Sequence, residues 1–211
     1  MMRKLAWILS ICLLLPATTT LAKKKKKKHK PAVHVLNCGG IERWAVKTAS
    51  DPNVKNKIRI TDPDTISIAA FVHRKRPAHV GPSLARQTKF DSAGGRPVES
   101  TFWISLEVHL VEFKMEADSD IHLVVSDPST HDLLTVEFPN PDCKGAAMSP
   151  FRARMVAARN ALIAKHGYPP KSAYKAITGT AIVGGIGFFD KVHGSHGSPT
   201  EYHPALLFEQ P

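Results

Sequence analysis

The segment Phe102-Trp-Ile-Ser-Leu-Glu-Val-His-Leu-Val-Glu-Phe-Lys-Met115 decides the fold prediction, because its apolar residues alternate with polar ones and then change phase. The first apolar series occupies even-numbered positions from Ile104 to Leu110, and the second occupies odd-numbered positions from Val111 to Met115. Successive side chains of a strand point to opposite faces, so a change of phase within one strand indicates a bulge or a sharp bend. The segment therefore predicts one long, bent strand.

Four shorter segments downstream are rich in β-forming residues, and turn residues such as Asp, Pro, Ser and Gly bound them. They predict four further strands, which span residues 121–125, 134–138, 177–189 and 205–208. Between the second and the third of them, Ser149 and Pro150 begin a pattern with apolar residues on one side, which ends at Gly167. That pattern is typical of one amphipathic helix.

The resulting order of three strands, a helix and two strands predicts a mainly β fold. Over residues 101–211 it resembles the oligonucleotide- and oligosaccharide-binding (OB) fold, a five-stranded Greek-key barrel with one helix. A half-open α+β sheet built from the same elements is the alternative. Residues 38–100, rich in Pro, Asp and basic residues, are expected to form an irregular N-terminal extension packed on the barrel. Within it, residues 66–72 predict a short helix capped by Thr65.

Residues 1–22 have the three-part layout of a secretory signal peptide. Two basic residues precede an apolar run from Leu5 to Leu15, and small residues then lead to Ala22. This run is too short to cross a bilayer, which takes about 20 helical residues. We therefore predict a cleaved signal, no transmembrane segment in the mature chain, and a secreted or periplasmic protein.

The formal net charge of +11, from 29 basic and 18 acidic residues, lies mainly near the N-terminus. Without Arg3 and Lys4 it is +9, and without the seven lysines from Lys23 to Lys30 it is +2. A block of like charge is usually disordered, so residues 23–37 predict a Lys-rich disordered leader. If the leader binds a partner, the partner is a polyanion, either nucleic acid or an anionic envelope polymer, and salt weakens the complex steeply.

The cysteines predict one disulfide bond. Once Cys12 is removed with the signal peptide, only Cys38 and Cys143 remain. Two cysteines in an oxidising compartment favour a bridge over two free thiols. The bridge would tie the N-terminal segment to the loop after the third predicted strand.

Two groups of acidic residues and histidines form the candidate site. The first lies around the turn between the first two predicted strands, and the second follows the fourth strand and enters the fifth. A closed barrel pairs its first strand with its fourth, which would bring the groups together. The main candidates are Asp118, Asp120, His122, Asp190, His193 and His203, and the secondary candidates are Glu116 and Glu201.

Carboxylates and neutral imidazoles are good ligands for a divalent metal of the Zn, Mn or Fe type. Such a metal would lower the pKa of a bound water and supply a nucleophile at neutral pH. Without a metal, a histidine and a carboxylate would serve as general base and general acid. Ordinary solvated turn and surface charge explains each residue taken singly, so the site is a hypothesis that requires the two groups to meet in space.

Three of these pieces also carry a family resemblance. Asp118-Ser-Asp-Ile-His122, Gly187-Phe-Phe-Asp190 with His193-Gly194 after it, and Glu201-Tyr-His-Pro204 resemble motifs of a family of small secreted bacterial proteins. The likeness covers most of the mature chain and implies a common origin, but it assigns no activity. A weaker likeness is to the thermonuclease barrel, where a paired-aspartate turn after the first strand helps to hold a divalent ion. The phosphate-clamping arginines of that family have no counterpart in this chain.

Three functions are compatible with the sequence. The first is an exported OB-like binding domain of unknown ligand, in which the Asp/His cluster is a candidate divalent-metal site. The second is a metal-dependent hydrolase that acts on phosphodiesters, and the third is a structural envelope protein whose lysine leader grips anionic polymers. The sequence shows no serine or cysteine nucleophile arrangement, and it does not decide whether the protein is an enzyme.

Overall fold

The computed structural model of the chain describes residues 35–38, 42–54, 58–89, 96–191 and 198–211. These residues belong to one unit, Val33–Pro211. The predicted signal peptide and nearly all of the predicted leader lie outside the described residues. Within the described ranges, no helix is both long enough and apolar enough to cross a membrane.

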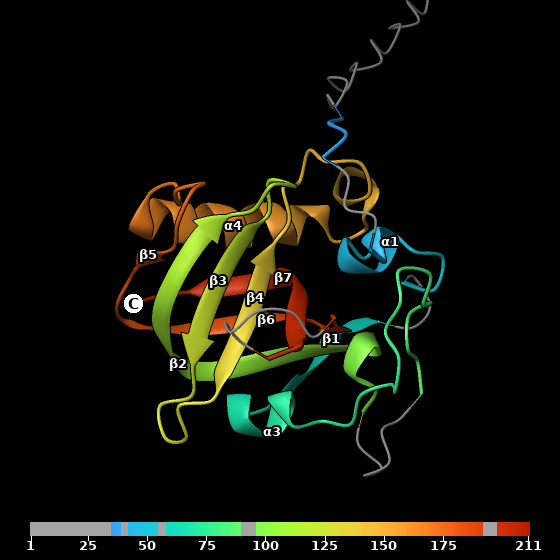
Figure 1. Cartoon of the computed structure of the whole chain (residues 1–211), viewed down its shortest axis with the longest axis horizontal. Helices are drawn as coiled ribbons and strands as arrows, with labels where there is room; N and C mark the ends of the chain where they lie inside the picture. The colour runs from blue at the N-terminus through green and yellow to red at the C-terminus, as the bar shows by residue number, and fades with distance from the viewer. Residues whose placement is uncertain (1–34, 39–41, 55–57, 90–95, 192–197) are drawn as a thin grey trace, which may run out of the picture. The chain divides into compact units, whose positions relative to one another are not determined.

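Five strands close into a barrel in the order β2-β3-β4-β7-β6, and β6 pairs with β2 to complete it (Figure 1). All neighbouring pairs are antiparallel except β4 and β7, which run parallel. With one long helix between β4 and β6, this is the OB-like Greek-key barrel that the sequence predicts. The strands are β2 (Thr101–Met115), β3 (Ile121–Ser126), β4 (Leu133–Phe138), β6 (Thr180–Phe189) and β7 (Thr200–Glu209).

Strand β2 is long and bent, as predicted, but it has two irregularities instead of one. Its register against β3 shifts between Leu110 and Glu112, which is the change of phase seen in the sequence. Its register against β6 shifts between Ser105 and Val108, which the sequence did not predict. An extra residue in a strand reverses the faces of the side chains beyond it. Leu106 is therefore 53% exposed, although the alternation placed it in the core.

The barrel interior is apolar, and one helix covers an end of it. Helix α4 (Arg152–His166) begins after Pro150 and ends at Gly167, close to the predicted limits, and it runs across one end of the barrel (Figure 1). Burial of apolar side chains from the barrel strands and from α4 supplies the main stabilising free energy of the fold. The fully buried side chains include Phe113, Leu123, Val136, Leu162, Val183 and Tyr202.

The N-terminal extension is more regular than predicted. Strand β1 (Arg59–Thr65) pairs in parallel with β2, outside the closed barrel. Helix α3 (Ile68–Val72) is present, but Ser67 caps it by accepting a hydrogen bond from the Ala70 N–H. The predicted cap, Thr65, belongs to β1. The other elements among the described residues are α1 (Trp44–Lys47), the 3-10 turns η1 (Val98–Ser100) and η2 (Ala146–Met148), and β5 (Lys175–Ala176), which pairs with β2.

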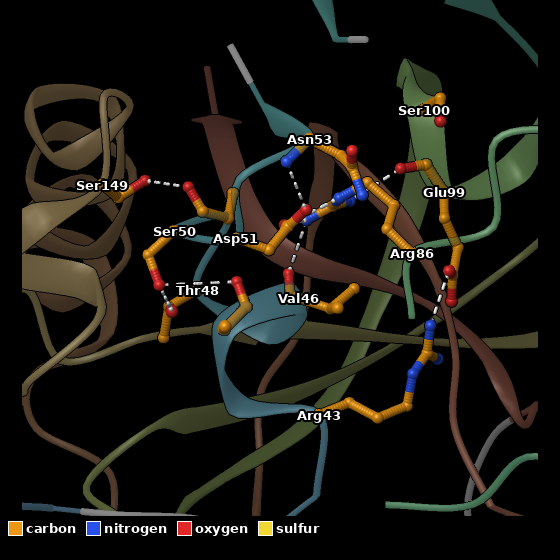
Figure 2. Close-up of polar contacts among 12 residues, drawn as sticks. Arg43, Val46, Thr48, Ser50, Asp51, Asn53, Arg86, Glu99, Ser100 and Ser149 are labelled. Carbon is orange, nitrogen blue, oxygen red and sulfur yellow. Dashed lines mark hydrogen bonds and ion pairs between the residues drawn. The ribbon is translucent and has the colours of Figure 1, made fainter. Parts of the chain in front are cut away.

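Two buried arginines hold distant segments of the extension together (Figure 2). Arg43 also attaches the extension to the barrel, because its Nη1 donates to the carbonyl oxygen of Phe189 in β6 at 2.7 Å. Arg43 Nη2 lies 2.6 Å from Glu99 Oε2, and Arg86 donates to Asp51 Oδ2 from Nη2 at 2.6 Å and from Nε at 2.8 Å. Arg86 also donates to the carbonyl oxygens of Glu99 and Val46. Buried charges that are paired and hydrogen-bonded in this way are costly to disrupt, because the partner left behind keeps its desolvated charge.

The predicted disulfide is present. Cys38 and Cys143 are bonded, their Cα atoms are 5.4 Å apart, and 105 residues separate them in sequence. For a loop of that length the chain-entropy model gives a stabilisation of about 4.7 kcal/mol. The bond holds the start of the extension beside the loop after β4, where Leu36 also pairs with Cys143.

Candidate functional site

The outer surface of three neighbouring strands brings acidic residues and histidines together. His122 of β3 is the register partner of Glu137 in β4, and Val136 of β4 is the partner of Tyr202 in β7. Val136 and Tyr202 are fully buried in the core, so the residues that flank them in their strands point outward. We call the resulting set the acid–histidine face, and it consists of Asp120, His122, Glu137, Glu201 and His203.

Each histidine of this face is held by a glutamate through the same ring nitrogen. His122 Nδ1 lies 2.6 Å from Glu137 Oε1, and His203 Nδ1 lies 3.1 Å from Glu201 Oε1. The other nitrogen of His203, Nε2, lies 3.4 Å from Asp120 Oδ2. The side chains of Asp120 and His203 are each only 2% exposed. The face is therefore an arrangement of largely buried ionisable groups with fixed orientations.

Four polar atoms of the face are buried without a hydrogen-bond partner among the described residues. They are two imidazole nitrogens, the Nε2 atoms of His122 and His203, and two carboxylate oxygens, Asp120 Oδ2 and Glu137 Oε2. A buried polar atom without a partner costs about 1–3 kcal/mol. Such atoms in a native fold therefore call for an explanation. A bound ion is one explanation, and a catalytic role is another.

Charge interactions shift the pKa values of the face in opposite directions. Burial alone would lower the pKa of His203, but the carboxylates of Asp120 and Glu201 raise it to about 9. Burial alone would raise the pKa of Glu137, but the charge of His122 and its hydrogen bond lower that pKa to about 2. The same contact raises the pKa of His122 against the effect of burial. At neutral pH Glu137 is thus ionised and His203 is protonated.

Further charged groups surround the face. Lys47 Nζ, from α1, lies 3.9 Å from Asp190 Oδ1. On the other side, Lys114 Nζ lies 3.0 Å from Glu116 Oε1, and that same oxygen is 3.7 Å from His122 Nδ1. The face itself contains three carboxylates, those of Asp120, Glu137 and Glu201, and the proton on His203 offsets their charge only in part. A cation that takes the place of the His203 proton is therefore electrostatically favoured there.

The two groups of residues singled out in the sequence meet in space, but the strands that bring them together are not the expected pair. The contact between Asp120 and His203 joins them across β3, β4 and β7, and the predicted pairing of the first strand with the fourth does not supply it. Glu116, Asp118 and Asp190 lie at the margin of the face. His193 lies outside the described residues.

Sequence reasoning missed Glu137 and Lys47. Glu137 alternates with Val136 and Phe138 in a predicted strand, so its outward position was readable from the sequence, but it stands apart from both acidic groups. Nothing in the sequence around Lys47 connects it with residues more than 70 positions away. The geometry of the sheet is needed to place it.

No three side chains of His, Cys, Asp or Glu in the described part of the chain already surround one point as metal ligands do. Among the described atoms, two sets are suited to ligation. One is the close pair of Asp120 Oδ2 and His203 Nε2, and the other is His122 Nε2 and Glu137 Oε2 on the adjoining strands, which have no described hydrogen-bond partner. The same groups are also suited to proton transfer, since a histidine oriented by a carboxylate is a usual general acid or base.

No protein-family model, curated protein or solved structure matches the chain. The resemblance to small secreted bacterial proteins, and the weaker one to thermonuclease barrels, stay predictions. A function for the chain is therefore argued from the acid–histidine face.

Proposed function

We propose that the chain is an exported OB-like binding domain whose acid–histidine face binds a divalent metal ion, with Zn²⁺ as the ion that its donor atoms suit best. One observation carries this proposal: His122 and His203 each hold Nδ1 against a glutamate and leave a buried Nε2 without a hydrogen-bond partner among the described residues. The Nε2 atom of His203 instead faces the Asp120 carboxylate. A histidine that ligates a metal ordinarily donates its other ring N–H to a carboxylate, a backbone carbonyl or water.

The spacing of the closest donor pair supports the proposal. Two ligands of a tetrahedral zinc ion, each about 2.0–2.1 Å from the metal, lie about 3.4 Å from each other. Asp120 Oδ2 and His203 Nε2 are 3.4 Å apart and neither has a hydrogen-bond partner. The ion would replace the proton that His203 carries in the ligand-free protein, as metal binding to histidine does in general. His122 Nε2 and Glu137 Oε2, the other buried atoms of the face without a described hydrogen-bond partner, are the candidates for further ligands.

Export rests on the layout of residues 1–22 and is supported by the disulfide, which is typical of oxidising compartments. The OB-like barrel supports a binding role only weakly, because the same fold carries many functions. The donor atoms on its outer face therefore carry the functional argument.

The test is a titration of the purified mature protein with Zn²⁺, followed by isothermal calorimetry, and with Co²⁺, whose visible absorption reports its coordination geometry. We expect one ion per chain and a tetrahedral Co²⁺ spectrum. Asp120→Asn should abolish Zn²⁺ binding and the tetrahedral Co²⁺ spectrum. Glu201→Gln should weaken Zn²⁺ binding by 10- to 100-fold, as is usual for the loss of a carboxylate behind a ligating histidine.

His109→Gln is the matched control, because His109 is exposed on β2 and should not affect binding. Circular dichroism must show that each variant is folded. Failure of the folded wild type to bind Zn²⁺ stoichiometrically would overturn the proposal, and so would binding that Asp120→Asn leaves unchanged.

A further inference from the structure

A lysine side chain from the N-terminal extension reaches the acid–histidine face. Lys47 is the last residue of α1, and its side chain is 16% exposed. Its Nζ lies 5.4 Å from the centre of the Phe188 ring, and the same ring packs against His203 with 5.6 Å between the ring centres. The ammonium group thus shares an aromatic neighbour with one of the proposed ligands.

The carboxylates around this ammonium group act on it without binding it tightly. Asp190 Oδ1, at 3.9 Å, is beyond the distance of a hydrogen bond. Burial alone would lower the pKa of Lys47, but the charges of Glu201, Asp190, Glu137 and Asp118 raise it. The lysine is therefore charged, and the attraction of these carboxylates holds it near the face without a hydrogen bond.

The backbone beneath Lys47 is firmly fixed. Arg43, which immediately precedes α1, is bound to Glu99 at 2.6 Å, and Arg86 donates to the carbonyl oxygen of Val46 at 2.9 Å (Figure 2). These contacts are buried, so α1 does not move away without breaking them. Only rotation within its own side chain is left to carry the ammonium group away from the face.

From this combination of a fixed backbone and a loosely held charge, we propose that Lys47 is a built-in counter-ion of the acid–histidine face. It competes with an external divalent cation and so sets the affinity of the site. This inference rests on the proposed function. Two positive charges repel one another across a poorly hydrated site far more strongly than in bulk water, so the metal binds only as tightly as this repulsion allows.

The experiment is a Zn²⁺ titration of the mature wild-type protein and of the variants Lys47→Met and Lys47→Arg. Methionine removes the charge while keeping much of the side-chain volume, and we expect it to raise the affinity at least tenfold. Arginine keeps the charge, and the affinity should stay within threefold of the wild type. Lys171→Met, at an exposed lysine, is the control and should have no effect. Lys47→Gln replaces the methionine variant if that variant does not fold.

The outcomes separate this inference from the function on which it rests. If the wild type binds Zn²⁺ and Lys47→Met binds it no more tightly, the role of Lys47 is refuted and the metal site stands. An equal gain in Zn²⁺ affinity in Lys47→Arg would show that the shape of the side chain matters and not its charge. That result would also refute the counter-ion role of Lys47. If neither the wild type nor Lys47→Met binds, both proposals fail.

Discussion

Replacing Arg86 by methionine is expected to lower the free energy of unfolding by about 3–5 kcal/mol, the usual cost of breaking a buried ion pair from one side. The Arg86 side chain is 0% exposed, and its guanidinium group donates to Asp51 Oδ2 and to the carbonyl oxygens of Val46 and Glu99. Methionine occupies similar space but donates no hydrogen bond. The carboxylate of Asp51, itself only 8% exposed, would remain buried without its cation.

The assay is urea unfolding of the oxidised protein, followed by tryptophan fluorescence. With a slope of about 2 kcal/mol per molar urea, typical of a small protein, the midpoint should fall by roughly 2 M while the slope stays constant. Because whole domains are stable by only about 5–15 kcal/mol, a loss of this size is easily measured.

A surface ion pair provides the control. Arg96 lies 3.3 Å from Asp62, with side chains that are 30% and 62% exposed, so Arg96→Met should cost no more than about 1 kcal/mol. The double variant Arg86→Met/Asp51→Leu should be more stable than Arg86→Met alone, because it also removes the stranded carboxylate. A cost for Arg86→Met no greater than that of Arg96→Met would refute the idea that this network holds the extension together.

Two further predictions concern Asp127 and Gly187. The Asp127 carboxylate accepts hydrogen bonds from backbone N–H groups, and these bonds lower its pKa. The bond from the Ser129 N–H has the largest effect. Its ionised form therefore stabilises the fold above the ordinary carboxyl pKa of about 3.9, and this contribution is lost as the pH falls through the lowered value. The stability difference between wild type and Asp127→Asn, about 1 kcal/mol at pH 7, should shrink in urea titrations at pH 3 and below, and a difference independent of pH would contradict this assignment. Gly187→Ala should lower thermal stability by about 1–3 kcal/mol, because its Cβ would lie 2.3 Å from the carbonyl oxygen of Val98. Gly81→Ala, with nothing within 4 Å, is its control, and equal effects of the two would argue against the close approach.

The barrel was largely predictable because its strands are segments of β-forming residues bounded by turn residues. In β3 the buried Ile121, Leu123 and Val125 alternate along the strand, and α4 keeps Leu162 in the core between a proline start and a glycine stop. Strand β1 was not predictable. Its sequence, Arg-Ile-Thr-Asp-Pro-Asp-Thr, has weak local preference for a strand, and it forms one because β2 offers a backbone to pair with.

The candidate site was predictable only in part. Asp120 and His203 stand out as members of local clusters, but their meeting depends on the parallel pairing of β4 with β7, which no local pattern reveals. The buried arginines were harder still. Arg43 and Arg86 lie in a polar segment that was expected to be irregular, and their acidic partners are 56 and 35 residues away.

Glu99 joins parts of the chain that are far apart in sequence. Its carboxylate pairs with Arg43, accepts from the Gln87 N–H at 2.6 Å, and accepts from the Phe189 N–H at 3.0 Å, one residue before Asp190. A mutational scan scored by cation binding would therefore mark Glu99 as intolerant, although it lies outside the acid–histidine face. A map drawn from such scores alone would make the binding surface look larger than it is. Scoring the same library for folded abundance would separate the residues that hold the site in place from those that form it.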